Sequence, residues 1–308
     1  MIKKTYLILA HKNPNQLKRL IDRINDENSF FIIHIDKKSD IEPFTNIIRG
    51  ANIQFLTNRT NCLWGDFSQI IATIRLMEEA IKSKRDGIII HLTGQDYPVK
   101  SLTKINCFLE THIKYNFIDS LPIEEVWKFY FDRTEMYKFN LSDTQRNYVI
   151  IRNISRKSLK LFFKGKISFG QLVLLLKKRK LKLGLRHYGG SAWWAFNSET
   201  NAKIYHYIHD NYKALRDYYQ YTIFPDEVFF QTIIKHLQEQ DSSIKIAPSL
   251  TYVNWTRNPE AASPLTFSID DIEELKLLPE NKLFARKFDT TLDEKILDAL
   301  DKWNGFAK

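Results

Sequence analysis

Short apolar runs alternate with amphipathic segments along the first third of the chain. Strands are predicted at Thr5–Ala10, at Phe30–Ile35, near Ile53–Leu56 and in the run "GIIIHLTG" at 87–94. Between them, "NPNQLKRLIDRI" repeats Leu and Ile on one helical face behind a proline suited to a first turn, and a second helix is predicted at Phe67–Ile81. Strand–helix–strand order with continuously apolar strands predicts an α/β fold, with a mostly parallel central sheet covered by helices on both faces.

The second half of the chain continues this mixture of elements. A strand is predicted in "GGSAWWAF" at 189–196, a helix at Glu199–Tyr218, another helix beginning at "PDEVFFQTIIKHL", and a last helix at Asp293–Trp303. Further short apolar stretches are "IKIAPSL", "TYVNW" and "LFARKFD". No internal repeat or linker interrupts them, so a single domain over 1–308 is expected, with an insertion at about 144–186.

That insertion is strongly basic. Residues 144–198 contain thirteen Lys or Arg and no Asp or Glu, in a chain whose net charge is +10. The basic residues are interspersed with Leu, Phe and Ile, a composition that suits an anionic surface: lipid headgroups if the apolar side chains insert, nucleic acid if they do not. The alternative is a solvated basic excursion that packs its leucines on its own domain. The apolar content favours a membrane surface, and nucleic acid is not expected as a partner.

The compartment predicted from the sequence is a reducing one. The two cysteines, Cys62 and Cys107, form neither a disulfide framework nor a metal-ligand spacing. The apolar run near the N-terminus is too short for a membrane span or a signal sequence. A cytoplasmic protein, peripheral on the inner face of a membrane, is therefore expected.

Polar segments follow three of the predicted strands: "AHKNP", "HIDKKSD" and "TGQDYPVK". In an open parallel sheet, ligands bind at the carboxyl ends of the strands, so these segments predict a common cleft. The chain has no glycine-rich phosphate loop, no HExxH, no CxxC pair, no GxSxG and no Asp-x-Asp. If the cleft transfers sugars from nucleotides, fixed cations rather than a metal must stabilise the departing diphosphate.

Seven segments taken together resemble one enzyme family. "YLILAHKNPNQLKRLI", "HIDKKSD", "WGDFSQI", "LTGQDYPVK", "GSAWWAF", "PDEVFFQT" and "LFARKFD" occur in the order expected of the core-2/I-branching N-acetylglucosaminyltransferases and peptide xylosyltransferases, glycosyltransferase family 14. The resemblance extends from about residue 5 to 289. It implies a GT-A-like fold, a UDP-sugar donor, inversion at the anomeric carbon, and neither a metal nor another cofactor.

The resemblance assigns the general base to Glu227. An inverting transfer is a single displacement and needs one carboxylate to take the proton of the acceptor hydroxyl. The alternative is that Glu227 and Asp226 only begin a helix, where acidic side chains are favoured by the macrodipole. Asp226 is expected to have a structural role.

The resemblance also assigns diphosphate binding to Arg286 and Lys287. Neighbours on a strand face opposite ways, so both can grip one phosphate only if the strand ends or turns there. The alternative is that one of the two solvates a sheet edge. For the uridine, the matching residues are Asp36, which could accept from the uracil N3–H, and His11 and Trp64, either of which could instead be a packing residue.

Acceptor and donor-sugar contacts are expected from aromatic side chains and carboxylates, because sugar rings present apolar faces with hydroxyl rims. Asp96 lies where the sugar hydroxyls would approach, or is a turn residue before Pro98. Trp193 and Trp194 face opposite sides of a strand, so one at most lines the cleft. Trp255 and Arg257 complete the candidates.

The expected function is therefore an inverting, metal-independent glycosyltransferase. It moves a sugar, with N-acetylglucosamine in β linkage as the first candidate, from a UDP-sugar to a hydroxyl of a glycan or lipid-linked glycan, in bacterial surface polysaccharide synthesis. Xylose, galactose and galactofuranose are alternative donor sugars. A non-catalytic basic binder of membrane or nucleic acid is the alternative from another class, but it leaves the seven segments unexplained.

Overall fold

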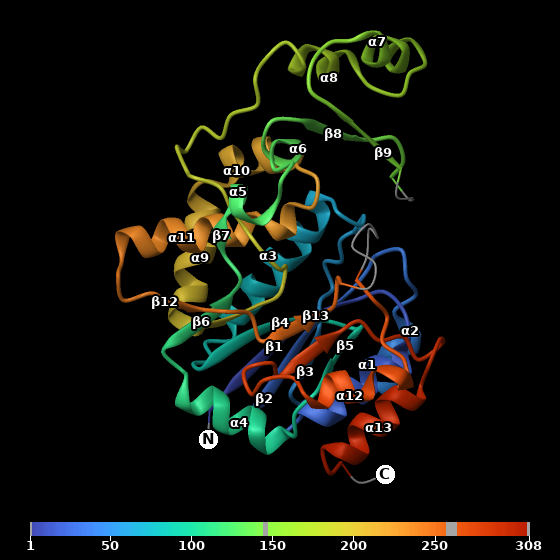
Figure 1. The fold of residues 1–308 in the computed structure, drawn as a ribbon, viewed down its shortest axis with the longest axis vertical. Helices are drawn as coiled ribbons and strands as arrows, with labels where there is room; N and C mark the ends of the chain where they lie inside the picture. Colours follow the sequence, from blue (N-terminus) through green and yellow to red (C-terminus); the bar gives the residue numbers. More distant parts are fainter. Residues whose placement is uncertain (1, 144–146, 257–263, 307–308) are drawn as a thin grey trace.

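A computed structural model describes residues 2–143, 147–256 and 264–306 (Figure 1). Its central sheet has seven strands in the order β12-β6-β11-β4-β1-β2-β3. These strands are β1 (Lys4–Ala10), β2 (Ser29–Ile35), β3 (Ile53–Phe55), β4 (Ile88–Thr93), β6 (Tyr115–Ile118), β11 (Trp194–Asn197) and β12 (Lys245–Ala247). β11 runs antiparallel to β4 and β6, whereas the other pairs are parallel. The sheet is thus mixed and mostly parallel.

Helices cover both faces of this sheet. α1 (Pro14–Ile24), α4 (Leu102–Thr111) and α13 (Lys295–Trp303) share one core with one face, and α3 (Phe67–Lys82), α9 (Ser198–Asp210) and α11 (Phe229–Gln240) share a second core with the other. Side chains alternate along a strand, so Tyr6 and Ile8 of β1 enter the first core and Leu7 enters the second. The predicted α/β fold with a mostly parallel sheet between helices is confirmed.

Two predicted helices differ from the structure. The helix expected at 199–218 is divided at Asn211 into α9 and α10 (Tyr212–Tyr219). The helix expected to begin at Pro225 begins instead at Phe229, because Val228 has a non-helical φ of −133°. Asp226 and Glu227 therefore belong to a separate 3-10 turn, η1 (Pro225–Glu227), and the prediction that they begin an α-helix is wrong.

A smaller sheet lies against the carboxyl end of β4. It contains β13 (Thr251–Val253), β14 (Phe284–Arg286) and β5 (Asp96–Pro98), and its register places Arg286 opposite Asp96. A two-stranded ladder pairs β7 (Leu121–Pro122) with β10 (Tyr188–Gly189). The remaining short elements are α2 (Glu42–Ile47), α5 (Ile123–Val126), α6 (Phe131–Thr134), α12 (Ile272–Lys276) and η2 (Ile269–Asp271).

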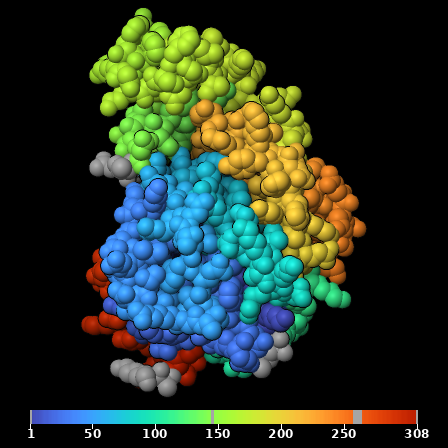
Figure 2. Space-filling view, turned by 180° about the vertical axis from the view of Figure 1, so that it is seen from behind, coloured from blue at the N-terminus to red at the C-terminus, as the bar shows by residue number. Residues whose placement is uncertain are grey.

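A lobe at one end of the longest axis projects from this body (Figures 1 and 2). It consists of β8 (Tyr137–Asn140) paired with β9 (Tyr148–Ile151), then α7 (Arg156–Phe163) and α8 (Phe169–Leu174). We call the described part of residues 137–180 the basic lobe. Six buried apolar side chains form its own small core: Tyr137, Phe139, Val149, Ile151, Ile167 and Leu175.

Two buried cations attach the basic lobe to the body. Lys138 pairs with Asp66, which also accepts from the Asn140 side chain and caps α3. Arg179 donates to the backbone carbonyls of Arg133 and Tyr218, and burial lowers the pKa of its guanidinium. Both thiols of the chain are free, and no described helix has the length and apolarity needed to cross a bilayer.

Candidate active site

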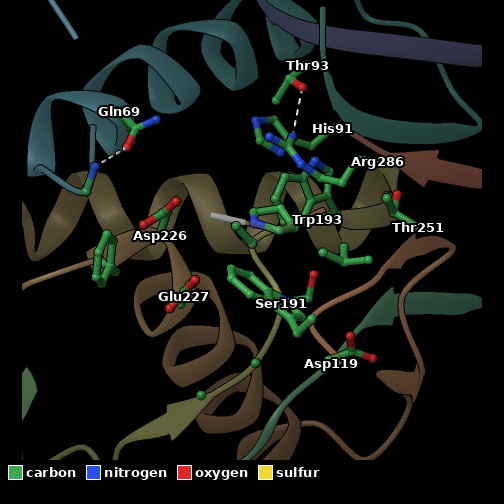
Figure 3. Close-up of a pocket in the computed structure, with 18 of the residues that line it drawn as sticks. Gln69, His91, Thr93, Asp119, Ser191, Trp193, Asp226, Glu227, Thr251 and Arg286 are labelled. Atoms are coloured by element: carbon green, nitrogen blue, oxygen red, sulfur yellow. Dashed lines mark hydrogen bonds between the residues drawn. The ribbon is translucent and has the colours of Figure 1, made fainter. Parts of the chain in front are cut away.

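A cavity of about 750 Å³ opens at the carboxyl ends of β1 and β4 (Figure 3). Its lining comes from both sheets, from η1 and from the loop before β11. Polar and charged side chains in the lining include His91, Thr93, Asp119, Arg133, Ser191, Asp226, Glu227, Thr251, Lys282 and Arg286. Of the three predicted polar segments, only "TGQDYPVK" contributes to the lining, through Thr93. Leu9 of β1 lines the cavity just before "AHKNP", and no residue of "HIDKKSD" lines it.

Glu227 points into this cavity beside Asp226 (Figure 3). Its Oε2 lies 2.9 Å from Nη2 of Arg133, and its side chain is 21 % exposed. Burial raises the pKa of Glu227 to about 7, Arg133 lowers it, and the neighbouring Asp226 raises it again. Burial also raises the pKa of Asp226. The result is a carboxylate poised to exchange a proton near neutral pH.

The turn that carries Glu227 is fixed from several sides. Phe224 adopts a left-handed conformation with φ of 48°, and its ring lies so close to Gly65 that a Cβ there would be 2.6 Å away. The Glu227 carbonyl accepts from the amide of Gly190, and the Gln231 side chain donates to the Asp226 carbonyl. These contacts hold the carboxylate against the loop before β11 rather than at the N-terminus of α11.

Arg286, Asp96 and Trp193 form the second part of the site. Nη1 of Arg286 lies 3.0 Å from Oδ1 of Asp96, and Oδ2 of the same carboxylate accepts from the indole N–H of Trp193 at 3.0 Å. The Arg286 guanidinium lies 4.0 Å from the centroid of the Trp193 ring and also donates to Thr93 (Figure 3). Asp96 thereby orients a cation and an aromatic ring in the cavity wall.

The placement of Asp96 differs from the prediction that sugar hydroxyls approach it. Its side chain is 0 % exposed and does not line the cavity, because β5 pairs it with β14 beneath the wall. Thr93 donates to both carboxylate oxygens, through its backbone N–H and its hydroxyl. Burial raises the pKa of Asp96, while Arg286 lowers it.

Three other predicted donor residues do not line the cavity: His11, Asp36 and Lys287. Burial lowers the pKa of His11; Lys12, Lys38 and Arg286 lower it further, and Asp36 opposes them. The Asp36 carboxylate accepts from the Lys38 amide at 2.9 Å. β14 ends at Arg286, so Lys287 leaves regular strand geometry, and burial lowers the pKa of its amine. The strand end that the sequence required is present.

The predicted tryptophans divide between the cavity and the core. Trp64, Trp193 and Trp255 line the cavity, with Trp64 packed edge-on against Phe224. Trp194 is buried, stacked on Phe196 and His91, so it does not contact the cavity. Arg257 lies outside the described residues.

Sequence reasoning missed two lining residues with clear chemistry. Arg133, whose guanidinium also stacks over Trp127 at 3.9 Å, lies in "YFDRTEM", a stretch without a recognisable pattern. His91 is buried in the wall, its ring stacks on that of Trp194, and burial lowers the pKa of the imidazole to about 3. The sequence signal for His91 was a polar residue inside the apolar strand "GIIIHLTG". In the described ranges, no cluster of three or more His, Cys, Asp or Glu side chains is placed to hold a metal.

Comparison with known proteins agrees with this geometry. The sequence pattern of the core-2/I-branching enzymes matches residues 5–276. The chain belongs to this family, glycosyltransferase family 14. The enzymes of this family are inverting, metal-independent glycosyltransferases, and the mixed α/β sheet of this chain is consistent with their GT-A-like fold.

Individual relatives are distant and much longer. Xylosyltransferase 2 of Rattus norvegicus is 24% identical over 321 residues, covering 98% of this chain and 33% of the relative. Xylosyltransferase oxt of Drosophila melanogaster is 23% identical over 317 residues, covering 96% of this chain and 33% of the relative. The chain thus spans about a third of the length of these relatives.

Proposed function

We propose that the protein transfers a sugar from a UDP-sugar to a hydroxyl of a glycan acceptor, with Glu227 as general base. The observation that carries the proposal is a cavity-facing carboxylate whose pKa burial raises to about 7 and whose described ionic partner is Arg133. Glu227 takes the proton of the acceptor hydroxyl, the acceptor oxygen forms the new bond to the anomeric carbon, and the bond from that carbon to the UDP oxygen breaks. Attack from the face opposite the leaving group inverts the configuration.

The departing diphosphate requires positive charge, for which we propose Arg286 and Lys287. Arg286 is supported by its position: it lines the cavity, and Asp96 and Thr93 both accept from its Nη1. A preorganised cation stabilises charge as it develops without reorganisation cost. Lys287 follows directly where β14 ends, and His11 interacts electrostatically with both Arg286 and Asp36. His11 and Asp36 are proposed to bind the nucleotide, together with Trp64.

N-acetylglucosamine in β linkage is the first donor sugar to test, and xylose is the second, since the relatives above are named xylosyltransferases. Galactose and galactofuranose complete the set. Trp193 and Trp255 offer flat faces to a sugar ring in the cavity, which supports a glycan or lipid-linked glycan as the acceptor. We place the enzyme at the cytoplasmic face of a bacterial membrane, in surface polysaccharide synthesis.

The decisive experiment replaces Glu227 by glutamine. Glu227→Gln keeps the shape of the side chain but cannot take a proton, so turnover with the preferred UDP-sugar should fall by about 100-fold or more. UDP affinity and the unfolding midpoint should stay near the parental values, because Gln retains an oxygen for Arg133.

Asp226→Asn is the matched control, since it changes the adjacent cavity carboxylate in the same way. It should reduce turnover much less. If Glu227→Gln retains more than about a tenth of parental turnover, the base assignment is wrong. A collapse in Asp226→Asn alone would transfer the role to Asp226.

A further inference from the structure

Two helices of the basic lobe present apolar side chains to solvent. On α7, Leu159 and Phe163 are four residues apart and therefore share a face, and Phe163 is 82 % exposed. On α8, Phe169 and Val173 repeat this spacing, and Phe169 is 68 % exposed. The same lobe buries six other apolar side chains, so these residues are exposed although a core lies beside them.

The exposed side chains gather in one place. The ring of Phe162 lies 5.5 Å from that of Phe163 and 6.3 Å from that of Phe169, measured between centroids, and thus joins the two helices. Leu176, just after α8, is 70 % exposed. We call Leu159, Phe163, Phe169, Val173 and Leu176 the apolar tip.

The helices that carry the apolar tip are well formed. Ser155 and Ser168 each make a complete capping box at the start of α7 and α8, with Ser158 and Gln171 as the reciprocal partners. Such caps satisfy the free amides of a first turn and fix its position. The exposure of the tip is therefore a property of ordered helices.

Positive charge surrounds the apolar tip. Six exposed lysines flank it in sequence: Lys157, Lys160, Lys164, Lys166, Lys177 and Lys178. None of the six forms an ion pair with a described carboxylate. The lobe's neighbouring Arg179 is different, because it is buried against backbone carbonyls of the body and holds the lobe in place.

We propose that the apolar tip inserts into the interface of a membrane rich in anionic lipids, with these lysines among the headgroups. Apolar side chains on one face of a helix, bordered by lysines, are the pattern of interfacial binding, and each lysine near such a surface adds attraction. The lobe lies at the end of the longest axis and projects from the body, so it can reach a flat surface first (Figure 2).

Two other occupants fit less well. A second copy meeting the tip through its own tip would bring two lobes together that have no acidic residue between 144 and 198, so their charges would repel. Nucleic acid would use aromatic rings for stacking, yet three of the five tip residues are aliphatic. Acyl chains accept both kinds of side chain.

The test is co-sedimentation of the full chain with vesicles. Binding is expected to vesicles of equal parts phosphatidylcholine and phosphatidylglycerol, weakening as salt rises, and not to phosphatidylcholine alone. Phe163→Ser with Phe169→Ser should weaken binding about tenfold or more, because the tip loses its apolar area. Lys160→Gln, Lys164→Gln and Lys166→Gln together should have an effect at least as large.

The opposite end of the molecule supplies matched controls. Leu277 and Leu292 are 83 % and 72 % exposed, but residues 270–301 hold ten Asp or Glu against five Lys or Arg. Leu277→Ser with Leu292→Ser, and Lys104→Gln with Lys114→Gln and Lys295→Gln, should leave vesicle binding unchanged. Every lobe variant should keep parental UDP affinity, which separates this proposal from the proposed function.

Several results would overturn the proposal. These are an absence of parental binding to the anionic vesicles, equal loss in the control variants, and loss with the lysine variant but not with the phenylalanine variant, which indicates surface adsorption without insertion. Tighter binding to a single-stranded oligonucleotide than to vesicles would favour nucleic acid. A parental dimer in solution that the phenylalanine variant dissociates would favour a second copy.

Discussion

The cavity and the basic lobe use positive charge in opposite ways. In the cavity wall, Arg286 pairs with Asp96 and Arg133 pairs with Glu227. Each guanidinium is therefore held in place by one carboxylate. In the lobe, the exposed lysines extend into solvent around an apolar tip. A fixed, partly buried charge acts over a few ångströms on a defined atom, whereas a cluster of solvated charges attracts a surface without fixing its orientation. Substitutions in the two regions should therefore change different measurements.

The largest contrast is expected in stability. Trp194 is buried and stacked on Phe196 with centroids 4.3 Å apart, so Trp194→Ala should lower the free energy of unfolding by about 3–5 kcal/mol. Phe163→Ala, on the exposed tip, should change it by no more than about 0.5 kcal/mol. Urea unfolding followed by circular dichroism measures both. Equal losses in the two variants would mean that the tip is part of a core.

UDP affinity gives the next contrast. Arg286→Ala removes a charge-assisted bond of about 1.5–3 kcal/mol, so the dissociation constant for UDP should rise about 10- to 150-fold. Lys287→Ala should raise it by a smaller factor, because Lys287 does not line the cavity. Isothermal titration calorimetry measures both. Lys178→Gln, in the lobe, should leave the constant unchanged.

Arg286→Ala also leaves Asp96 buried without its cation, so the thermal unfolding midpoint must be measured on the same sample. Arg286→Lys keeps the charge while losing the fork, and is expected to recover part of the affinity. If both alanine variants bind UDP as the parent does, the assignment of this pair is wrong.

The sequence predicted the alternating strands and helices of the body well, because the spacing of apolar residues within a segment determines its secondary structure with little help from distant segments. It also identified Glu227, Arg286 and Trp193, which the structure places around one cavity. It did not predict that η1 is separate from α11, since this depends on the backbone angles of Phe224 and Val228 beside Gly65.

Partners brought from distant segments were the other omission. Arg133 and Glu227 are 94 positions apart in the sequence, and the segment around Arg133 has no periodic pattern. Asp96 was expected at the cavity surface, but it is buried because β5 pairs with β14. The sequence around Asp96 does not predict this pairing. Both contacts join segments that are far apart in the sequence, so only the structure could show them.

The pH profile tests the role of Arg133. A general base acts when deprotonated, so kcat/KM should fall as pH drops below about 7, the pKa to which burial raises Glu227. Arg133 lowers that pKa by favouring the charged form, so Arg133→Gln should move the acid limb to higher pH. Arg133→Lys should restore part of the shift, and Arg152→Gln in the lobe should cause none. An acid limb that stays in place in Arg133→Gln would show that this ion pair does not set the pKa of the base.

The smallest expected effect is that of chelation, and it tests whether the fixed cations of the cavity suffice. Asp96 fixes Arg286, and the described residues hold no cluster of metal-binding side chains, so the proposed mechanism assigns the charge of the diphosphate to Arg286. Excess EDTA should therefore leave turnover within measurement error of the untreated enzyme. A more demanding form of the test adds Mn²⁺ or Mg²⁺ to Arg286→Ala. A divalent cation could replace the lost charge only if the cavity offered it ligands, so turnover of this variant should not recover. Complete loss of parental activity on chelation, restored by Mn²⁺, would defeat the metal-free mechanism and assign the leaving-group charge to an ion instead of to Arg286.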